Sequence, residues 1–235
     1  MSKKNNVWKF ENYEIKYSEA YSDEFYQDFI NNFQKNTKKR LFYKFIKRAF
    51  DIFASLFALI VLSPLLLGIA IAIKLDSKGP VLFKQNRIGH KNKVFTIYKF
   101  RSMRIDAPHD KEPEDLKNAN LFYTKLGGFL RKTSLDEFPQ FINVLKGDMS
   151  FIGYRPALVS EEVSKQINGI RDALGVFEMK PGISGYAQVL GRNDVFYKNK
   201  ALMDAYYVKN ASILMDLKLI FGTVKVVLSR DGNNS

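Results

Sequence analysis

The chain has 235 residues, of which 37 are lysine or arginine and 24 are aspartate or glutamate, so its formal net charge is +13. This length allows one domain with its own core, or a modest domain with an appendage. The positive charge favours phosphate-rich partners: nucleic acid, anionic lipid headgroups or a nucleotide. The absence of cysteine excludes disulfides, thiolate nucleophiles and cysteine-ligated zinc, and only two histidines argue against a histidine-rich metal site.

Residues 1–43 are predicted to form a polar N-terminal extension that is rich in aromatic side chains. Within it, Phe25, Phe29 and Phe33 recur at the spacing of one helical face. The pattern predicts an amphipathic helix. The helix lies either on a membrane or on the body of the protein, and the residues alone leave both alternatives open.

The next feature is an uncharged run from Ile52 to Ile73. As one straight helix it would be about 33 Å long, close to the roughly 30 Å thickness of a bilayer core. Pro64 interrupts the run, because proline lacks a backbone N–H and clashes with the preceding turn. Each remaining limb spans roughly half a bilayer. Ser63 can offer its hydroxyl to the opened backbone, as helix breaks in membranes require.

Basic side chains flank both ends of this run, namely Lys44, Lys47 and Arg48 before it and Lys74, Lys78, Lys84 and Arg87 after it. The positive-inside tendency therefore predicts that both ends are cytoplasmic. Residues 44–80 fit a re-entrant helix, which enters and leaves the membrane on one face. A kinked spanning helix is the alternative, and it stays open at this point because spanning helices tolerate proline.

Two β-like runs follow, from Val81 to Ile88 and from Val94 to Met103, with a turn at residues 89–92 between them. Strand alternation places Lys99 and Arg101 on one face of the second run. Two neighbouring cations suit an anion contact, although a solvated strand face is the commoner explanation of the pair alone. Polar residues then predict a loop over residues 106–120.

Helical patterning resumes from Leu121 to Leu145, and a short strand is expected from Ile183 to Leu190 in a glycine-rich region. Further helices are predicted from Lys198 to Val208 and from Ile213 to about Ser229, the latter capped by Ser212. The apolar residues of the last helix face either a membrane or the core. They are Leu214, Leu217, Phe221, Val224 and Leu228.

A pair of adjacent carboxylates, Asp136 and Glu137, completes an S-x-x-E capping pattern that begins at Ser134. This places both in the first turn of a helix, where the positive end of the dipole favours their ionised form. A carboxylate attacks phosphorus without needing a base. Mg²⁺ usually binds through one or two carboxylates plus substrate phosphates. These residues alone favour an ordinary surface capping box, and a phosphate-transfer site is the alternative that the pair leaves open.

Two arginines, Arg155 and Arg192, follow glycine-containing turns. The planar guanidinium suits phosphate oxygens, but a solvated loop arginine is the commoner explanation of either residue alone.

Read together, these segments resemble the monotopic phosphoglycosyl transferases, the bacterial sugar transferase family that starts lipid-linked glycan assembly. The matching segments are KRAFDIFASLFALIVLSPLLL, GPVLFKQNRIG, FTIYKFRSM, LRKTSLDEFPQFINVLKGDMSFIGYRPAL, KPGISGYAQVLGRND and YYVKNASILMDLKLIFGTVKVVL. They cover roughly residues 44–230 in the family's order. That shared order makes the resemblance far more specific than any single motif.

The resemblance implies a mostly helical α+β monotopic membrane protein with a small β-hairpin or sheet and amphipathic interfacial helices. Its re-entrant helix breaks at Ser63-Pro64, and its catalytic domain, residues 81–235, lies on the cytoplasmic face of the bacterial inner membrane. Asp136 matches the family's nucleophile and Glu137 its partner carboxylate, which is associated with Mg²⁺. Asp136 is then expected to attack the β-phosphate of a UDP-sugar and expel UMP. Undecaprenyl phosphate takes up the resulting covalent sugar phosphate.

The resemblance assigns six residues to substrate binding as a group: Lys99, Arg101, Arg131, Arg155, Gln188 and Arg192. The implied partners are a UDP-sugar, undecaprenyl phosphate and membrane lipids, without nucleic acid, and a homo-oligomer is left open. The product would start a capsule, exopolysaccharide, O-antigen or glycoprotein glycan. The segment Gly191 to Asp194 looks more like members that use N-acetylated sugars. A non-catalytic basic scaffold on the membrane surface is the alternative function.

Two positions depart from the family pattern. Tyr154 stands where the family often has proline, and Tyr186 where tryptophan is common. Both put the local loop shape in doubt without affecting the chemistry. The sequence resembles the short, core-only form of the family with an added N-terminal segment.

Overall fold

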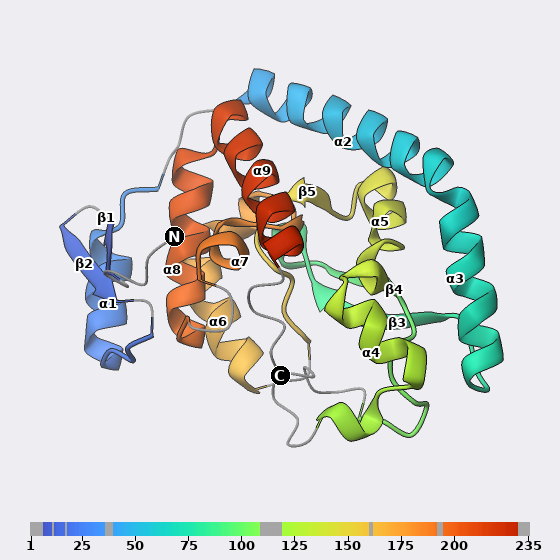
Figure 1. Cartoon of the computed structure of the whole chain (residues 1–235). Helices are drawn as coiled ribbons and strands as arrows, with labels where there is room; N and C mark the ends of the chain where they lie inside the picture. Colours follow the sequence, from blue (N-terminus) through green and yellow to red (C-terminus); the bar gives the residue numbers. More distant parts are fainter. Residues whose placement is uncertain are drawn as a thin grey trace.

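Helices α2 (Leu41–Val61) and α3 (Ser63–Asp76) form a bent arm along one side of the protein (Figure 1). The computed structural model describes residues 7–10, 12–16, 18–35, 40–108, 119–159, 162–191 and 195–229. The predicted loop at residues 106–120 therefore lies largely outside the described residues.

The remaining described elements, in chain order, are β1 (Val7–Phe10), β2 (Tyr13–Lys16), α1 (Asp23–Asn32), β3 (Leu82–Ile88), η1 (His90–Asn92), β4 (Val94–Phe100), η3 (Ala119–Phe122), α4 (Lys125–Lys132), η4 (Leu135–Glu137), α5 (Gln140–Lys146), β5 (Ser150–Ile152), α6 (Glu162–Ala173), η5 (Val176–Glu178), β6 (Gly182–Ser184), α7 (Tyr186–Leu190), α8 (Tyr197–Asn210) and α9 (Ile213–Ser229). The strands pair two by two: β1–β2 and β3–β4 are antiparallel, and β5–β6 is parallel. The predicted class, mostly helical α+β, is confirmed.

The break in the arm lies where the sequence predicts it. The axes of α2 and α3 differ by 62°. Pro64 lies in the first turn of α3, where its missing N–H has no intrahelical partner to lose. The Ser63 hydroxyl donates to the Ile60 carbonyl over 2.8 Å, so it compensates the opened backbone as expected. Helix α2 begins at Leu41, however, and so continues through the basic cluster that precedes the apolar run.

The outward surface of this arm is apolar. The side chains of Phe42, Phe53 and Phe57 are between 69% and 75% exposed. No single described helix is long and apolar enough to cross a membrane, whereas α2 and α3 together meet that length and composition. A contiguous apolar surface of this kind usually marks a membrane or protein contact.

The inward surface of α2 is polar and anchored to the domain. Asp51, which is only 2% exposed, accepts hydrogen bonds from the Ser150 hydroxyl at 3.0 Å and the Phe151 N–H at 3.1 Å. Arg48 donates to the Val144 and Leu145 carbonyls at the end of α5. The arm is therefore fixed to β5 and α5, the two elements on either side of residues 147–149.

The predicted hairpin is confirmed as β3 and β4. Lys91 and Asn92 adopt positive φ in the connecting turn, as a tight reversal requires. The Asn143 side chain from α5 accepts from the Tyr98 N–H at 3.0 Å and donates to the Thr96 carbonyl at 2.7 Å. It thereby occupies the backbone groups of the β4 edge and holds α5 against the strand.

Two predicted elements differ in the structure. The helical patterning over Leu121–Leu145 corresponds to two helices, α4 and α5, and Ser134, which adopts the left-handed conformation (φ 58°), follows the C-cap of α4 instead of starting the second helix. The strand over Ile183–Leu190 ends at Ser184, and α7 follows Gly185. A Cβ on Gly185 would lie 1.8 Å from the Gly153 carbonyl oxygen, so the close backbone packing between strand and helix requires glycine there.

The two C-terminal helices are confirmed as α8 and α9. The Ser212 hydroxyl accepts from the Met215 N–H at 3.3 Å, which is the predicted cap. On α9, Leu214 and Phe221 are 63% and 71% exposed, while Leu219 is buried. The core-facing alternative for the Leu214–Phe221 stripe is therefore wrong, and α9 presents a second exposed apolar surface.

The described residues of the N-terminal extension lie on the body of the protein. Trp8, Phe10 and Phe29 share one buried core with Leu202 and Met203 of α8. The predicted helical face is confirmed in α1, where Tyr26 and Phe29 are buried and followed by Phe33. The hairpin β1–β2 and α1 together form an N-terminal module, residues 7–35, that packs as part of the domain.

Replacing Trp8 with alanine should destabilise this core. The Trp8 ring is 6% exposed and lies 5.3 Å from the Tyr206 ring and 6.3 Å from the Tyr186 ring, measured between centroids. We expect the free energy of unfolding to fall by about 3 to 5 kcal/mol, as for other large-to-small core changes. Thermal unfolding measures the loss, with exposed Lys9→Ala on the same strand as the control. Equal stability of the two variants would contradict the packing role.

Candidate active site

The carboxylate pair lies in η4, a single turn between α4 and α5. The Glu137 N–H donates to the Ser134 carbonyl over 3.3 Å, but the Ser134 side chain forms no capping bond. The predicted capping box is therefore wrong: Ser134 terminates α4, and the next helix begins at Gln140. A short turn between two helices, rather than the first turn of a long helix, sets the direction of Asp136 and Glu137.

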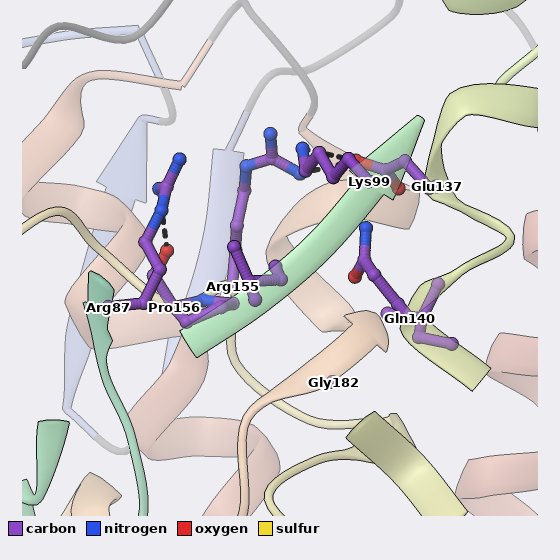
Figure 2. A pocket seen from close by; sticks show the side chains of 9 residues that line it. Arg87, Lys99, Glu137, Gln140, Arg155, Pro156 and Gly182 are labelled. Atoms are coloured by element: carbon purple, nitrogen blue, oxygen red, sulfur yellow. Dashed lines mark hydrogen bonds and ion pairs between the residues drawn. The ribbon is translucent and has the colours of Figure 1, made fainter. Parts of the chain in front are cut away.

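Two cations meet at one oxygen of Glu137 (Figure 2). Lys99 Nζ from β4 lies 3.0 Å from Glu137 Oε1, and an Arg155 guanidinium nitrogen lies 3.4 Å from the same oxygen. The Glu137 side chain is 21% exposed and that of Arg155 is 40% exposed, so the group opens to solvent. The structure thus brings together three residues that the sequence places far apart.

The environment separates the pKa values of the two carboxyls. The pKa of Asp136 is raised to about 6, because burial and the neighbouring Glu137 charge outweigh the opposing charges of Lys99, Arg131 and Arg155. Burial also acts to raise the pKa of Glu137, but Lys99 and Arg155 outweigh it and hold that pKa well below its usual range. Glu137 is therefore always ionised near neutral pH. Asp136 is ionised at pH 7 and protonated in mild acid.

The remaining predicted residues are divided between the site and its surroundings. Arg131 of α4 lies over the Tyr123 ring at 5.4 Å, and its charge acts on Asp136. Gln188 of α7 donates to the Ile183 carbonyl at 3.3 Å, and Ile183 lines the cleft at Glu137. Arg192 lies outside the described residues.

Arg101 has a different set of partners. Its guanidinium donates to the carbonyls of Ser77 at 2.7 Å and Lys78 at 2.8 Å, just beyond the end of α3. Strand β4 ends at Phe100, so the alternation that would align Arg101 with Lys99 no longer holds at that residue. The structure brings Lys99 to Glu137 and directs Arg101 to the end of α3, where the bent arm joins the domain.

A small cleft surrounds the cations on Glu137. Its lining residues are Arg87, Ile97, Lys99, Glu137, Gln140, Arg155, Pro156, Gly182 and Ile183. Sequence reasoning missed Arg87 and Gln140 as site residues. Both lie inside the family-like segments, Arg87 in GPVLFKQNRIG and Gln140 four residues after Asp136. Their place in these segments is the feature of the sequence that could have identified them as site residues.

The donor set limits which metal the site can hold. The described residues contain no group of three or more histidine, aspartate or glutamate side chains that could hold a metal ion. Adjacent carboxylates suit Mg²⁺ only when substrate phosphates supply further oxygen ligands. Because both cations contact Oε1 of Glu137, its carboxylate has a second oxygen available for such an ion. The residues therefore fit a Mg²⁺ ion that is shared with a bound diphosphate.

The chain matches the family model for bacterial sugar transferases over residues 42–230. It is 41% identical over 203 residues to the undecaprenyl-phosphate galactose phosphotransferase of Salmonella typhimurium. This alignment covers 80% of this chain and 42% of that protein. It is 43% identical over 192 residues to an exopolysaccharide production protein of Rhizobium leguminosarum bv. phaseoli, with 79% and 96% covered. It is 40% identical over 195 residues to a UDP-N-acetylgalactosamine-undecaprenyl-phosphate N-acetylgalactosaminephosphotransferase of Aeromonas hydrophila, with 81% and 45% covered.

The chain therefore spans less than half the length of two of these relatives and nearly all of the third. The matched range begins just after α2 starts and contains the whole carboxylate site, while the N-terminal module precedes it. The family model covers most of the chain, and the three relatives share 40% to 43% of its residues over the aligned parts, which is more than a chance likeness of short motifs would give. The chain belongs to the bacterial sugar transferase family.

Proposed function

We propose that this protein transfers a sugar 1-phosphate from a UDP-sugar to undecaprenyl phosphate and so starts a lipid-linked glycan. The observation that carries the proposal is the buried Asp136 beside Glu137, Lys99 and Arg155, in a chain of this family. The Salmonella and Aeromonas relatives are named for galactose and N-acetylgalactosamine at 41% and 40% identity. Similarity of this degree supports the reaction class and leaves the sugar to experiment, the N-acetylated preference included.

In the proposed first step, the ionised Asp136 carboxylate attacks the β-phosphorus of the UDP-sugar. The bond from that phosphorus to the oxygen bridging the two phosphates breaks, and UMP leaves with the bridging oxygen. The products are UMP and a covalent aspartyl sugar phosphate. Asp136 requires no base for this step, because most of its carboxyl is already ionised at pH 7.

Cations at the cleft hold the diphosphate for this attack. Lys99 and Arg155 supply positive charge beside Asp136, and Arg131 adds a third charge from α4. Glu137 would hold Mg²⁺ together with phosphate oxygens, and the ion would neutralise charge on the leaving group. Gln188 and Arg192 belong to the same group by resemblance. Arg101 supports the site through the end of α3.

In the second step, a phosphate oxygen of undecaprenyl phosphate attacks the phosphorus held by Asp136. The bond between Asp136 and phosphorus breaks, the carboxylate is restored, and the lipid diphosphate sugar leaves. The acceptor is insoluble in water, so the site must lie at a membrane surface. The exposed apolar surfaces of α2, α3 and α9 support this position.

The arm is proposed to enter the inner membrane from the cytoplasmic face and return to that face. Helix α3 has 14 residues, about 21 Å, which is too short to cross a bilayer core of about 30 Å. Its last residues are fixed to the domain by Arg101, and the first part of α2 is fixed by Arg48. Both ends of the arm therefore return to one body, as a re-entrant helix requires.

Single cysteines test this topology in a chain that has none of its own. Cysteines placed at exposed Lys44 and Lys78 should both react with a membrane-impermeant reagent only from the cytoplasmic side. Labelling in inside-out and right-side-out vesicles makes the comparison. Labelling of the two positions from opposite sides would show a spanning helix instead.

Purified protein with Mg²⁺, undecaprenyl phosphate and a panel of UDP-sugars tests the function itself. One or more UDP-sugars should release UMP in proportion to the lipid product. The alternative scaffold role predicts binding to anionic vesicles with no UMP release from any UDP-sugar. Lipid binding without turnover would therefore replace the transferase proposal.

A further inference from the structure

Gln140 is a buried amide with an unused hydrogen-bond donor. It is the first residue of α5 and is 2% exposed. Among the parts of the chain that the structure describes, its Nε2 atom has no hydrogen-bond partner. A buried donor without an acceptor costs about 1 to 3 kcal/mol, so native structures rarely keep one unless a ligand or water completes it.

The donor is directed into the active-site cleft. Gln140 lines this cleft with Lys99, Glu137 and Arg155. In Figure 2 its amide nitrogen points toward the side where Lys99 meets Glu137. An acceptor that reaches the two cations would also come within reach of the amide.

The helix that carries Gln140 is anchored both to β4 and to the arm. The next turn of α5 is bound to β4 through Asn143, which is fully buried, and the end of α5 is bound to the arm through Arg48. These contacts fix the backbone from which the Gln140 side chain extends into the cleft. Preorganised donors of this kind stabilise developing negative charge at little reorganisation cost.

The charges around the cleft favour an acceptor that is negatively charged and that fits beside ionised Glu137. The cations at Glu137 select for an anion, while the neutral amide adds a directed hydrogen bond without altering the charge of the site. A phosphoryl group bound for attack by Asp136 presents such oxygens. The reaction shifts negative charge among these oxygens. A hydrogen-bond donor placed beside them therefore stabilises the transition state more than the bound substrate.

We propose that Gln140 Nε2 donates a hydrogen bond to a non-bridging oxygen of the phosphoryl group that Asp136 receives and passes on. Gln140 is then a catalytic residue of the proposed transferase, and the assignment rests on that function. Its role differs from those of Lys99 and Arg155, which supply charge. It binds the transferred group in the UDP-sugar and again in the covalent intermediate.

Gln140→Met tests the assignment, because methionine keeps the length of the side chain and removes the donor. We expect kcat for UMP release to fall by about 10²- to 10³-fold, as for other single donors to a reacting oxyanion, while KM changes far less. The unfolding temperature of the free protein should stay the same or rise, since an unsatisfied buried amide is removed. Gln27→Met on exposed α1 is the matched control and should keep full activity.

Gln140→Glu provides a second variant of nearly identical shape, whose ionised carboxylate accepts hydrogen bonds instead of donating them. It should lose at least as much activity as Gln140→Met. Wild-type kcat in either variant would overturn the proposal, as would a loss of activity that appears only together with a lower unfolding temperature. Failure of the wild-type protein to release UMP would refute the transferase function, and this assignment with it.

Discussion

Asp136→Asn should reduce UMP release by at least about a thousandfold, because the asparagine amide cannot attack phosphorus. The change replaces one carboxylate oxygen with an amide nitrogen and removes the negative charge, while keeping the size of the side chain. The variant should fold normally, since Asp136 is 4% exposed and its burial already disfavours the charged form. Matched assays of UMP release and thermal unfolding measure both expectations.

Asp106→Asn is the control for this change. Asp106 pairs with Arg104 on an exposed segment, and both side chains are more than half exposed, at 57% and 55%. Its replacement should leave activity and stability close to wild type. If Asp136→Asn kept more than about a tenth of wild-type activity, Asp136 would not be the nucleophile.

Lys99→Met should lower kcat/KM by about a hundredfold at pH 7 and shift its pH dependence. Lys99 lowers the pKa of both Asp136 and Glu137 and donates a 3.0 Å hydrogen bond to Glu137. Without it the Asp136 pKa, already raised to about 6, rises further. More of the nucleophile is then protonated at neutral pH.

The activity should increase with pH, because the attacking form of Asp136 is the ionised one. Wild-type kcat/KM should rise as the pH increases through about 6, where Asp136 loses its proton. The same limb should lie at higher pH in Lys99→Met. Profiles recorded between about pH 5 and pH 9 make the comparison, with exposed Lys93→Met as the control. Coincident profiles for Lys99→Met and wild type would show that Lys99 does not act on the nucleophile.

Local chemistry made part of this fold predictable. The break at Ser63-Pro64 follows from the steric clash of proline and from the hydrogen bond of the Ser63 hydroxyl to the Ile60 carbonyl. Both effects act within one helical turn. The Ser212 cap and the hairpin turn at Lys91 are equally local. Each of these predictions depends only on neighbours in sequence.

A prediction from the sequence fails where a residue contacts a different element from the one that its pattern suggests. Ser134 fits a capping box, but it ends α4 in a left-handed conformation instead. Arg101 fits the alternation of β4, but the strand ends at Phe100 and the guanidinium turns to α3. Patterns of three to five residues cannot show which of two adjoining elements a side chain will contact.

Tertiary contacts decide the rest. Trp8 is buried by residues of α8 that are almost two hundred positions away, which no pattern in residues 1–43 reveals. Gln140 gains its significance from Lys99 and Arg155, which reach the same cleft from β4 and from the segment after β5. The candidate nucleophile was available from the family-like motif, whereas its protonation state depended on the surrounding fold.

The covalent intermediate on Asp136 is the centre of this account, and intact-protein mass spectrometry tests it most directly. Wild-type protein given Mg²⁺ and its UDP-sugar, without lipid acceptor, should gain the mass of one sugar phosphate and release an equal amount of UMP. Asp136→Asn should show neither, and added undecaprenyl phosphate should remove the extra mass from the wild type. UMP that appears only when the lipid is present, with no change in protein mass, would contradict the account and indicate direct transfer.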